Sequence, residues 1–265
     1  MAHPDHPPGI RPPHQDQGRC GKRPAPVVIA PLTEADVEEA ARLYTEVFLA
    51  DEPTSRRCAL DPACFLPHAR FYVRSLVGKG LSFVARDERT NEIAGFIFCF
   101  DMTFDPKEEG EEMVAYLANF REPVAMIDEL EARCLTRAAV PFGSVVHAFQ
   151  GGVSRKYRLS RVMKALVLRL IAHARERGYR KIVADCTSPA SHRVLAQCGF
   201  TQVGFLSYDA FVIDGVRFFA DSKGASPLWQ RTFSVSIVVV AKYFTGFRED
   251  VEYFFCRKKI PEIVR

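Results

Sequence analysis

Apolar residues recur along this 265-residue chain with two different periods. Between residues 33 and 50 they are spaced three and four apart, which predicts an amphipathic helix. That spacing is carried by Val37, Ala40, Ala41, Tyr44, Val47 and Phe48. Residues 162–177 repeat the pattern, and Gly178 ends it where a positive φ costs least. Short apolar runs predict strands at 27–31, 145–153 and 181–186.

The remaining segments complete an alternation of strands and helices. Thr33 and Asp36 have the spacing of a capping box at the start of the first helix. We predict further helices at 63–78 and 123–135, a hairpin of 81–85 with 93–100, an acidic polar insertion at 106–121, and antiparallel strands at 202–213 and 234–243. This order predicts an α/β (α+β) fold with a mixed, mostly antiparallel central sheet and helices on both faces.

Composition divides the chain into one domain with two appendages. Residues 1–26 hold seven of the seventeen prolines and few apolar side chains, so we predict a disordered leader rather than a signal peptide. Residues 27–244 form the predicted domain, and residues 245–265 are a C-terminal extension, either an extra edge strand or a partner surface. No apolar run reaches the roughly 18 residues of a membrane span, so we expect no membrane partner.

Charge and cysteines exclude several classes of function. A net charge of +4 is too small to indicate a nucleic-acid partner, which needs a concentrated basic face. The eight cysteines contain no CxxC pair, so neither a metal site nor a disulfide framework is expected from them. The leader has three histidines, for which a solvated tail is the alternative to metal binding. We expect reduced thiols and a cytoplasmic protein.

The segment around residues 150–163 carries the strongest chemical signal. Gly151 and Gly152 end a predicted strand, where glycine indicates a bulge or the close approach of a ligand. A basic loop follows, and then the N-terminus of a helix, whose free N–H groups suit a phosphate or pyrophosphate. The basic residues of that loop are Arg155, Lys156, Arg158 and Arg161. The alternative is a solvated basic loop.

This segment resembles the GNAT superfamily of acyl-CoA N-acyltransferases. The signature of the superfamily at this place is Arg or Gln, two residues, Gly, one residue, and Gly or Ala. Arg158 matches, but Arg161 and Met163 occupy the two small positions. We expect Arg161 to adopt helical φ/ψ, and its side chain either to block the anion or to clamp it. The resemblance implies acetyl-CoA as co-substrate, held at Gly152, Val153, Arg155, Arg158, Leu159, Ser160, Arg161, Val162 and Met163.

Two distant segments resemble one branch of that superfamily, the arylalkylamine N-acetyltransferase-like branch. Asp51-Glu52-Pro53 is similar to the branch's Asp-Glu-Pro turn, and residues 186–191 resemble its Cys-Ser-Ser-x-x-Ser run. A short helix ending in Gly199-Phe200 also resembles the superfamily. The likeness covers about residues 27–240, is weak at 106–135, and is absent from the leader and the tail.

The resemblance implies roles for a few side chains. Glu52 would take a proton from the amine, backbone N–H groups near Gly152 would stabilise the oxyanion, and Ser191 or Thr187 would protonate the departing thiolate. Many members have a tyrosine acid where this chain has Leu195. The alternatives are a surface turn for Glu52 and helix capping for both hydroxyls.

His147 lies within an apolar strand, where a hydrogen-bonded core histidine is the alternative to a base. The sequence thus predicts an N-acyltransferase that moves an acetyl group to a small-molecule primary amine of an aromatic or hydrophobic kind. Two alternatives stay open: a longer acyl-CoA or acyl-carrier-protein donor, and a non-catalytic binding module of the same fold. No resident metal is expected, and the sequence predicts no oligomeric state.

Overall fold

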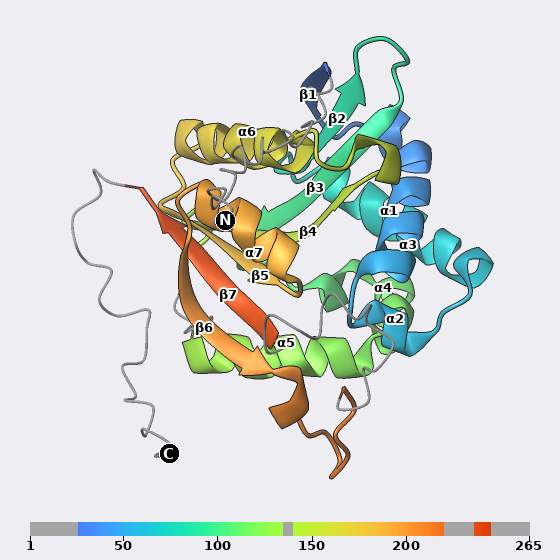
Figure 1. Cartoon of the computed structure of the whole chain (residues 1–265), viewed down its shortest axis with the longest axis vertical. Helices are drawn as coiled ribbons and strands as arrows, with labels where there is room; N and C mark the ends of the chain where they lie inside the picture. Colours follow the sequence, from blue (N-terminus) through green and yellow to red (C-terminus); the bar gives the residue numbers. More distant parts are fainter. Residues whose placement is uncertain (1–25, 135–139, 220–235, 245–265) are drawn as a thin grey trace, which may run out of the picture.

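A computed structural model describes residues 26–134, 140–219 and 236–244 of the chain and places a seven-stranded sheet at its centre (Figure 1). The strands are β1 (Val27–Pro31), β2 (Phe83–Asp87), β3 (Ile93–Asp101), β4 (Val145–Val153), β5 (Lys181–Cys186), β6 (Thr201–Ser207) and β7 (Ser236–Tyr243). Their order is β1-β2-β3-β4-β5-β7-β6, and β4 with β5 is the parallel pair. The predicted mixed, mostly antiparallel sheet is confirmed.

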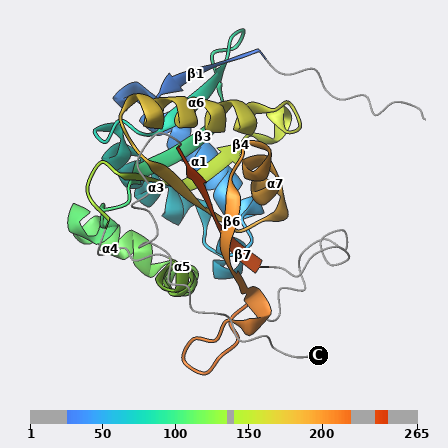
Figure 2. The same ribbon diagram turned by 90° about the vertical axis from the view of Figure 1, so that its left-hand side faces the viewer.

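Helices cover both faces of this sheet (Figures 1 and 2). They are α1 (Val37–Asp51), α2 (Ser55–Cys58), α3 (Pro62–Val77), α4 (Glu111–Ala118), α5 (Arg121–Cys134), α6 (Val162–Glu176) and α7 (Pro189–Gln197). On one face α6 and α7 share a core with the sheet, and on the other α1, α3 and α4 share a core rich in aromatic rings. A third core lies between α5 and the strands β5 and β6.

The predicted capping box is present at the 3₁₀ turn Glu34–Asp36, which leads into α1. Thr33 donates from its N–H and its hydroxyl to Asp36 Oδ2, at 2.8 and 2.6 Å, and Arg86 of β2 pairs with Asp36 Oδ1 at 2.5 Å. Burial alone raises the pKa of Asp36, but the hydrogen bonds from Thr33 and Arg86 outweigh it and hold that pKa below its ordinary value. The helix start is therefore fastened to strand β2 of the sheet by one carboxylate.

Two segments differ from the sequence prediction. The acidic insertion at 106–121 contains α4, because Met113 and Tyr116 give it a buried face, and the Tyr116 ring stacks on Tyr72 at 5.4 Å. The strand predicted through residue 213 ends at Ser207, and a 3₁₀ turn, Tyr208–Ala210, follows. The alternating pattern continues there because Tyr208 is buried without belonging to a strand.

Strand β4 departs from its neighbour β5 at a bulge. Phe98 of β3 pairs with Gln150 and Cys99 pairs with Ala148, so Phe149 is one extra residue in β4. The parallel pairing of β4 with β5 ends at Ala148, whereas β4 continues along β3 to Val153. The sheet therefore divides at this point, and the later half of β4 leaves one edge without a strand partner among the described residues.

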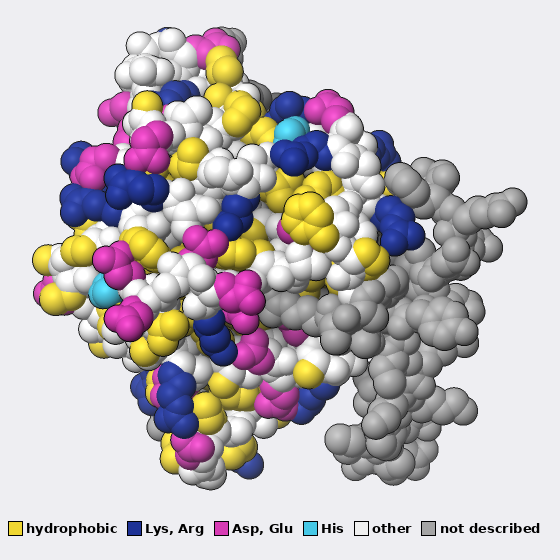
Figure 3. All heavy atoms as spheres, turned by 180° about the vertical axis from the view of Figure 1, so that it is seen from behind, with side chains coloured by type: hydrophobic (Ala, Val, Ile, Leu, Met, Phe, Trp, Pro, Cys, Tyr) yellow, Lys and Arg dark blue, Asp and Glu magenta, His cyan; other side chains and the backbone are white. Residues whose placement is uncertain are grey.

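Figure 3 shows acidic, basic and hydrophobic side chains intermixed over one face of the molecule. No helix in the described part of the chain is long and apolar enough to cross a membrane. The predicted leader and C-terminal extension lie outside the described residues, as do the leader's three histidines.

Candidate active site

Glu52 stands where α1 ends and the chain turns into α2. Its backbone is extended, with φ −78° and ψ 124°, and its N–H still donates to Phe48 O. The carboxylate atom Oε2 accepts from the Thr54 hydroxyl at 2.6 Å and from the Ser55 N–H at 2.5 Å. The other atom, Oε1, is buried and has no hydrogen-bond partner among the described residues. Glu52 is thus a held carboxylate with one free acceptor, which a surface turn residue would not be.

The predicted hydroxyls lie at the start of α7. Ser188 is the N-cap, since its side chain accepts from Ser191 N–H at 3.2 Å. The Ser191 hydroxyl donates back to Ser188 O at 2.8 Å. Capping thus falls to Ser188 and Ser191 rather than to Thr187, whose carbonyl oxygen accepts from the Tyr208 hydroxyl at 3.2 Å.

Tyr208 is a site residue that the sequence reading missed. It is 2% exposed, and burial, together with the charge of Glu52, raises the pKa of its hydroxyl well above the ordinary value. The residue therefore lies within electrostatic reach of Glu52 while its hydroxyl contacts the β5–α7 connection. The sequence predicted a strand through this residue, where an aromatic ring is ordinary and signals no role. The turn that positions Tyr208 depends on where β6 ends.

The loop before α6 keeps a left-handed backbone without glycine. Leu159 has φ 67° and Arg161 has φ 64° with ψ 13°. The expectation of helical φ/ψ for Arg161 is therefore wrong: it is the N-cap of α6, and the turn between Tyr157 and Val162 requires a positive φ there. For a residue with a Cβ that conformation costs about 1–2 kcal/mol. The loop has thus kept the shape that glycine would favour.

The start of α6 offers the donors that an anion needs. The first helical hydrogen bond joins Ala165 N–H to Arg161 O at 3.0 Å, so the N–H groups of Val162, Met163 and Lys164 have no partner inside the helix. Together with the positive end of the helix dipole, these N–H groups suit a phosphate group. Ser160 is buried and its hydroxyl donates to Tyr157 O, so it shapes the loop rather than facing solvent.

Carboxylates already neutralise most of the basic loop. Arg155 and Arg158 both pair with Asp51, the residue before Glu52, with Arg155 at 3.4 Å. Lys156 pairs with Glu92. Arg161 is exposed and has no carboxylate partner among the described residues. Asp51 thus links the basic loop before α6 to the end of α1.

The two glycines of β4 make room for side chains. A Cβ on Gly152 would meet the Phe96 ring at 2.7 Å and Val47 at 3.0 Å, and a Cβ on Gly151 would meet the Met163 methyl at 3.0 Å. Gly152 is therefore required by packing. Ser154 N–H donates to Ala94 O on β3, and because N–H groups alternate along a strand, the Val153 N–H points to the open edge.

Comparison with known proteins now decides the family. Residues 38–200 match the family described as "Acetyltransferase (GNAT) family". The chain belongs to the GNAT family. It is accordingly an acyltransferase of that family, and the predicted resemblance is confirmed. A search of curated proteins returned no match.

Several solved structures share this GNAT fold. Arylalkylamine N-acetyltransferase 2 from Aedes aegypti matches with a TM-score of 0.64 and 16% identity over 82% of this chain and 98% of that one. The C-terminal condensation domain of Ebony, in complex with beta-alanyl-dopamine, matches with 0.63 and 18% over 83% and 100%. The Drosophila melanogaster polyamine N-acetyltransferase, which forms N-acetylagmatine, matches with 0.55 and 17% over 82% and 100%. At these identities the likeness shows the fold.

Proposed function

We propose that this GNAT protein transfers an acetyl group from acetyl-CoA to a small primary amine, and that the amine is hydrophobic or aromatic. The observation that carries the proposal is the Glu52 carboxylate, with Oε2 held by two donors and Oε1 buried and free. A primary amine reaches the protein as an ammonium ion, which has no lone pair for attack. A fixed carboxylate beside the acceptor removes that obstacle.

The reaction then follows from the groups around the open edge of β4. Glu52 Oε1, directly or through one water, accepts a proton from the ammonium. The amine nitrogen forms a bond to the thioester carbonyl carbon, and the Val153 N–H stabilises the oxyanion. The C–S bond breaks and leaves the acetyl group on nitrogen. The nitrogen loses its second proton, Glu52 passes the first to solvent, and the CoA thiolate receives a proton from a neighbouring acid, which the second proton of the nitrogen restores.

As the acid that protonates the thiolate, we add Tyr208 to the two hydroxyls that the sequence predicted, Ser191 and Thr187. Tyr208 stays protonated at working pH because its pKa is raised, and it lies within the field of Glu52. Ser191 already donates to Ser188 O. Tyr208 thus takes the role that a tyrosine at the position of Leu195 has in many GNAT proteins, and Leu195 here packs in the core.

The proposal of a hydrophobic or aromatic amine rests on the rings near the end of α1. Phe48 lies one turn before Glu52, and its ring meets Phe120 edge to face at 5.4 Å. Phe149, the bulged residue of β4, packs against the same core. Apolar surface beside one fixed carboxylate favours an amine that carries a hydrophobic body.

The test is thiol release from acetyl-CoA with a panel of primary amines. We expect Glu52→Gln to lower kcat/KM by about 10²–10⁴-fold, most at low pH, where more of the amine is protonated. Glu46→Gln is the matched control, because Glu46 lies on the exposed side of the same helix. Unchanged kinetics in Glu52→Gln would remove Glu52 as the base.

The same assay separates the alternatives. Competition between acetyl-CoA, longer acyl-CoA and acyl-carrier-protein donors, read by mass spectrometry, identifies the donor. If acetyl-CoA gives neither thiol release nor thermal stabilisation, the interpretation that remains is a non-catalytic GNAT module. We expect acetyl-CoA to stabilise the chain, because the loop before α6 has the left-handed backbone and the first N–H groups of α6 have no partner inside the helix.

A further inference from the structure

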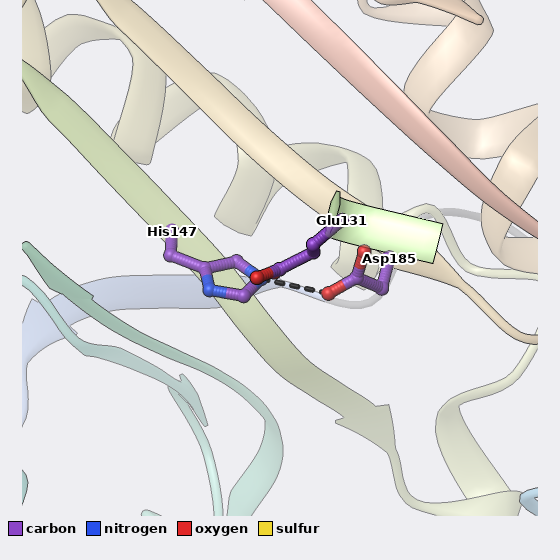
Figure 4. A group of neighbouring side chains, drawn as sticks. All are labelled: Glu131, His147 and Asp185. Carbon is purple, nitrogen blue, oxygen red and sulfur yellow. Dashed lines mark hydrogen bonds and ion pairs between the residues drawn. The ribbon is translucent and has the colours of Figure 1, made fainter. Parts of the chain in front are cut away.

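Three side chains from distant parts of the sequence meet under α5. Figure 4 shows His147 of β4, Asp185 of β5 and Glu131 of α5 pointing toward one another. His147 Nε2 lies 2.8 Å from Asp185 Oδ2 and 3.6 Å from Glu131 Oε1. The three side chains are only 2%, 2% and 5% exposed. This buried cluster stands outside the residues assigned to acetyl transfer above.

The arrangement converges on one point. In a proton relay, a carboxylate holds one ring nitrogen and the other nitrogen faces the reacting group. Here both carboxylates approach the same nitrogen of His147, and the three ligating atoms all lie within 4.8 Å of one another. Two carboxylates brought together away from water share either a proton or a positive charge, and a metal ion would supply that charge. Convergence of N and O donors around a point is the geometry of a metal site.

The spacing fits a tetrahedral ion with little movement. Two ligands about 2.0–2.2 Å from such an ion lie about 3.4 Å apart. The 3.6 Å between His147 and Glu131 is close to that value, and the 2.8 Å hydrogen bond between His147 and Asp185 must lengthen slightly. Asp185 Oδ1 is buried with no hydrogen-bond partner among the described residues. The two oxygens of one carboxylate lie too close together to fill two corners of a tetrahedron, so a water would complete the coordination.

We propose that Glu131, His147 and Asp185 form a binding site for a divalent transition-metal ion of the Zn²⁺ type. Imidazole nitrogen with carboxylate oxygens suits zinc, whereas Mg²⁺ and Ca²⁺ prefer six or more oxygen ligands. The ligands are almost fully covered, so the site braces the structure. It ties α5 to β4 and β5 beside the point where those two strands separate.

Binding must displace a proton. The hydrogen bond between His147 Nε2 and Asp185 requires an N–H on that nitrogen, and a metal ion replaces this hydrogen. In a neutral imidazole that hydrogen moves to Nδ1, whereas an imidazolium releases one proton to solvent. The affinity consequently falls as the pH falls, because protons compete for the same ligands.

The experiment is calorimetric titration of the full chain, stripped with EDTA, with ZnCl₂ and separately with MgCl₂ and CaCl₂. We expect one zinc equivalent, a higher Tm and no response to magnesium or calcium. Each of His147→Gln, Glu131→Gln and Asp185→Asn should lower that affinity at least tenfold, the cost typical of a lost metal partner. Circular dichroism checks that each variant folds.

Two controls separate this cluster from other zinc ligands. Replacing the leader histidines His3, His6 and His14 with Gln should leave the binding of one zinc equivalent unchanged, and so should His173→Gln. Cobalt in the wild-type chain should show d–d bands without a thiolate charge-transfer band, a readout that needs no cluster variant. Absence of zinc binding, a thiolate band, or binding that survives the three cluster variants would overturn the proposal.

Discussion

The methyl group of Met163 lies 3.0 Å from the point where a Cβ on Gly151 would stand. Met163 occupies a position at which the GNAT signature has a small residue, and the glycine opposite it on β4 accepts the added bulk. The larger side chain at position 163 of α6 is thus matched by a glycine on β4, so the space between the two elements is not overfilled.

This pair predicts a coupled effect on stability. Gly151→Ala should change the free energy of unfolding by less than about 1 kcal/mol, because the new methyl group meets only the end of the flexible Met163 side chain, which must move slightly. In a Met163→Ala background the same change should raise stability by about 0.5–1 kcal/mol, since alanine costs less than glycine within a strand. Denaturant unfolding of the four proteins measures the coupling, and strictly additive effects would show that the two residues do not compete for space.

The left-handed loop predicts opposite effects of Arg161→Gly on folding and on binding. Removing the Cβ at φ 64° relieves about 1–2 kcal/mol, partly offset by about 0.5–1 kcal/mol of added chain entropy in the unfolded state. Stability should therefore rise slightly. Affinity for CoA should fall about fivefold, because we expect the guanidinium, which has no carboxylate partner among the described residues, to clamp the pyrophosphate.

Leu159→Gly is the matched control for that change, since Leu159 has φ 67° and an exposed apolar side chain. It should raise stability by a similar amount and lower CoA affinity less than Arg161→Gly does in titration calorimetry, because it removes no charge. Tighter CoA binding by Arg161→Gly would instead mean that the arginine blocks the anion.

The ion pairs of Asp51 predict a gain in donor affinity on their removal. Asp51→Asn releases Arg155 and Arg158 for phosphate groups, and we expect CoA to bind about threefold tighter at low salt, with the gain shrinking at high salt. Glu92→Gln, which releases Lys156, is the comparison. Weaker CoA binding by Asp51→Asn would show that these pairs hold the loop in its binding shape.

The capping carboxylate predicts a pH dependence of stability. The pKa of Asp36 is held below its ordinary value of 3.8 in the folded chain, so the unfolded chain binds more protons in that range. The contribution of Asp36 is therefore fully present above about pH 5 and is lost as the pH falls through and below 3.8. Asp36→Asn should lower stability by about 1–2 kcal/mol at pH 7 and by less at pH 3.

The exposed pair of Glu34 with Arg74 supplies the control for that measurement. Glu34→Gln should change stability little at either pH, because exposed ion pairs contribute little. Equal losses in the Asp36 variant at pH 7 and pH 3 would contradict a titrating cap.

Local pattern was enough for most elements of the fold. The period of apolar residues predicted α1, α3 and α6, and the capping box at Thr33 is present as expected. Pattern was insufficient for α4, since its charged residues conceal a buried face that exists only because α3 supplies aromatic partners. The strand expected to residue 213 was wrong because a buried aromatic looks alike in a strand and in a turn.

The sequence by itself determined the family likeness, the Glu52 turn and the basic loop before α6, because each depends on residues that are neighbours in the chain. Tertiary structure alone decided that Arg161 has a positive φ, that Met163 faces Gly151, and that Tyr208 lies in the field of Glu52. It also brought together Glu131, His147 and Asp185. The physical reason is that backbone strain and buried polar contacts are set by packing between segments far apart in sequence, which local patterns do not record.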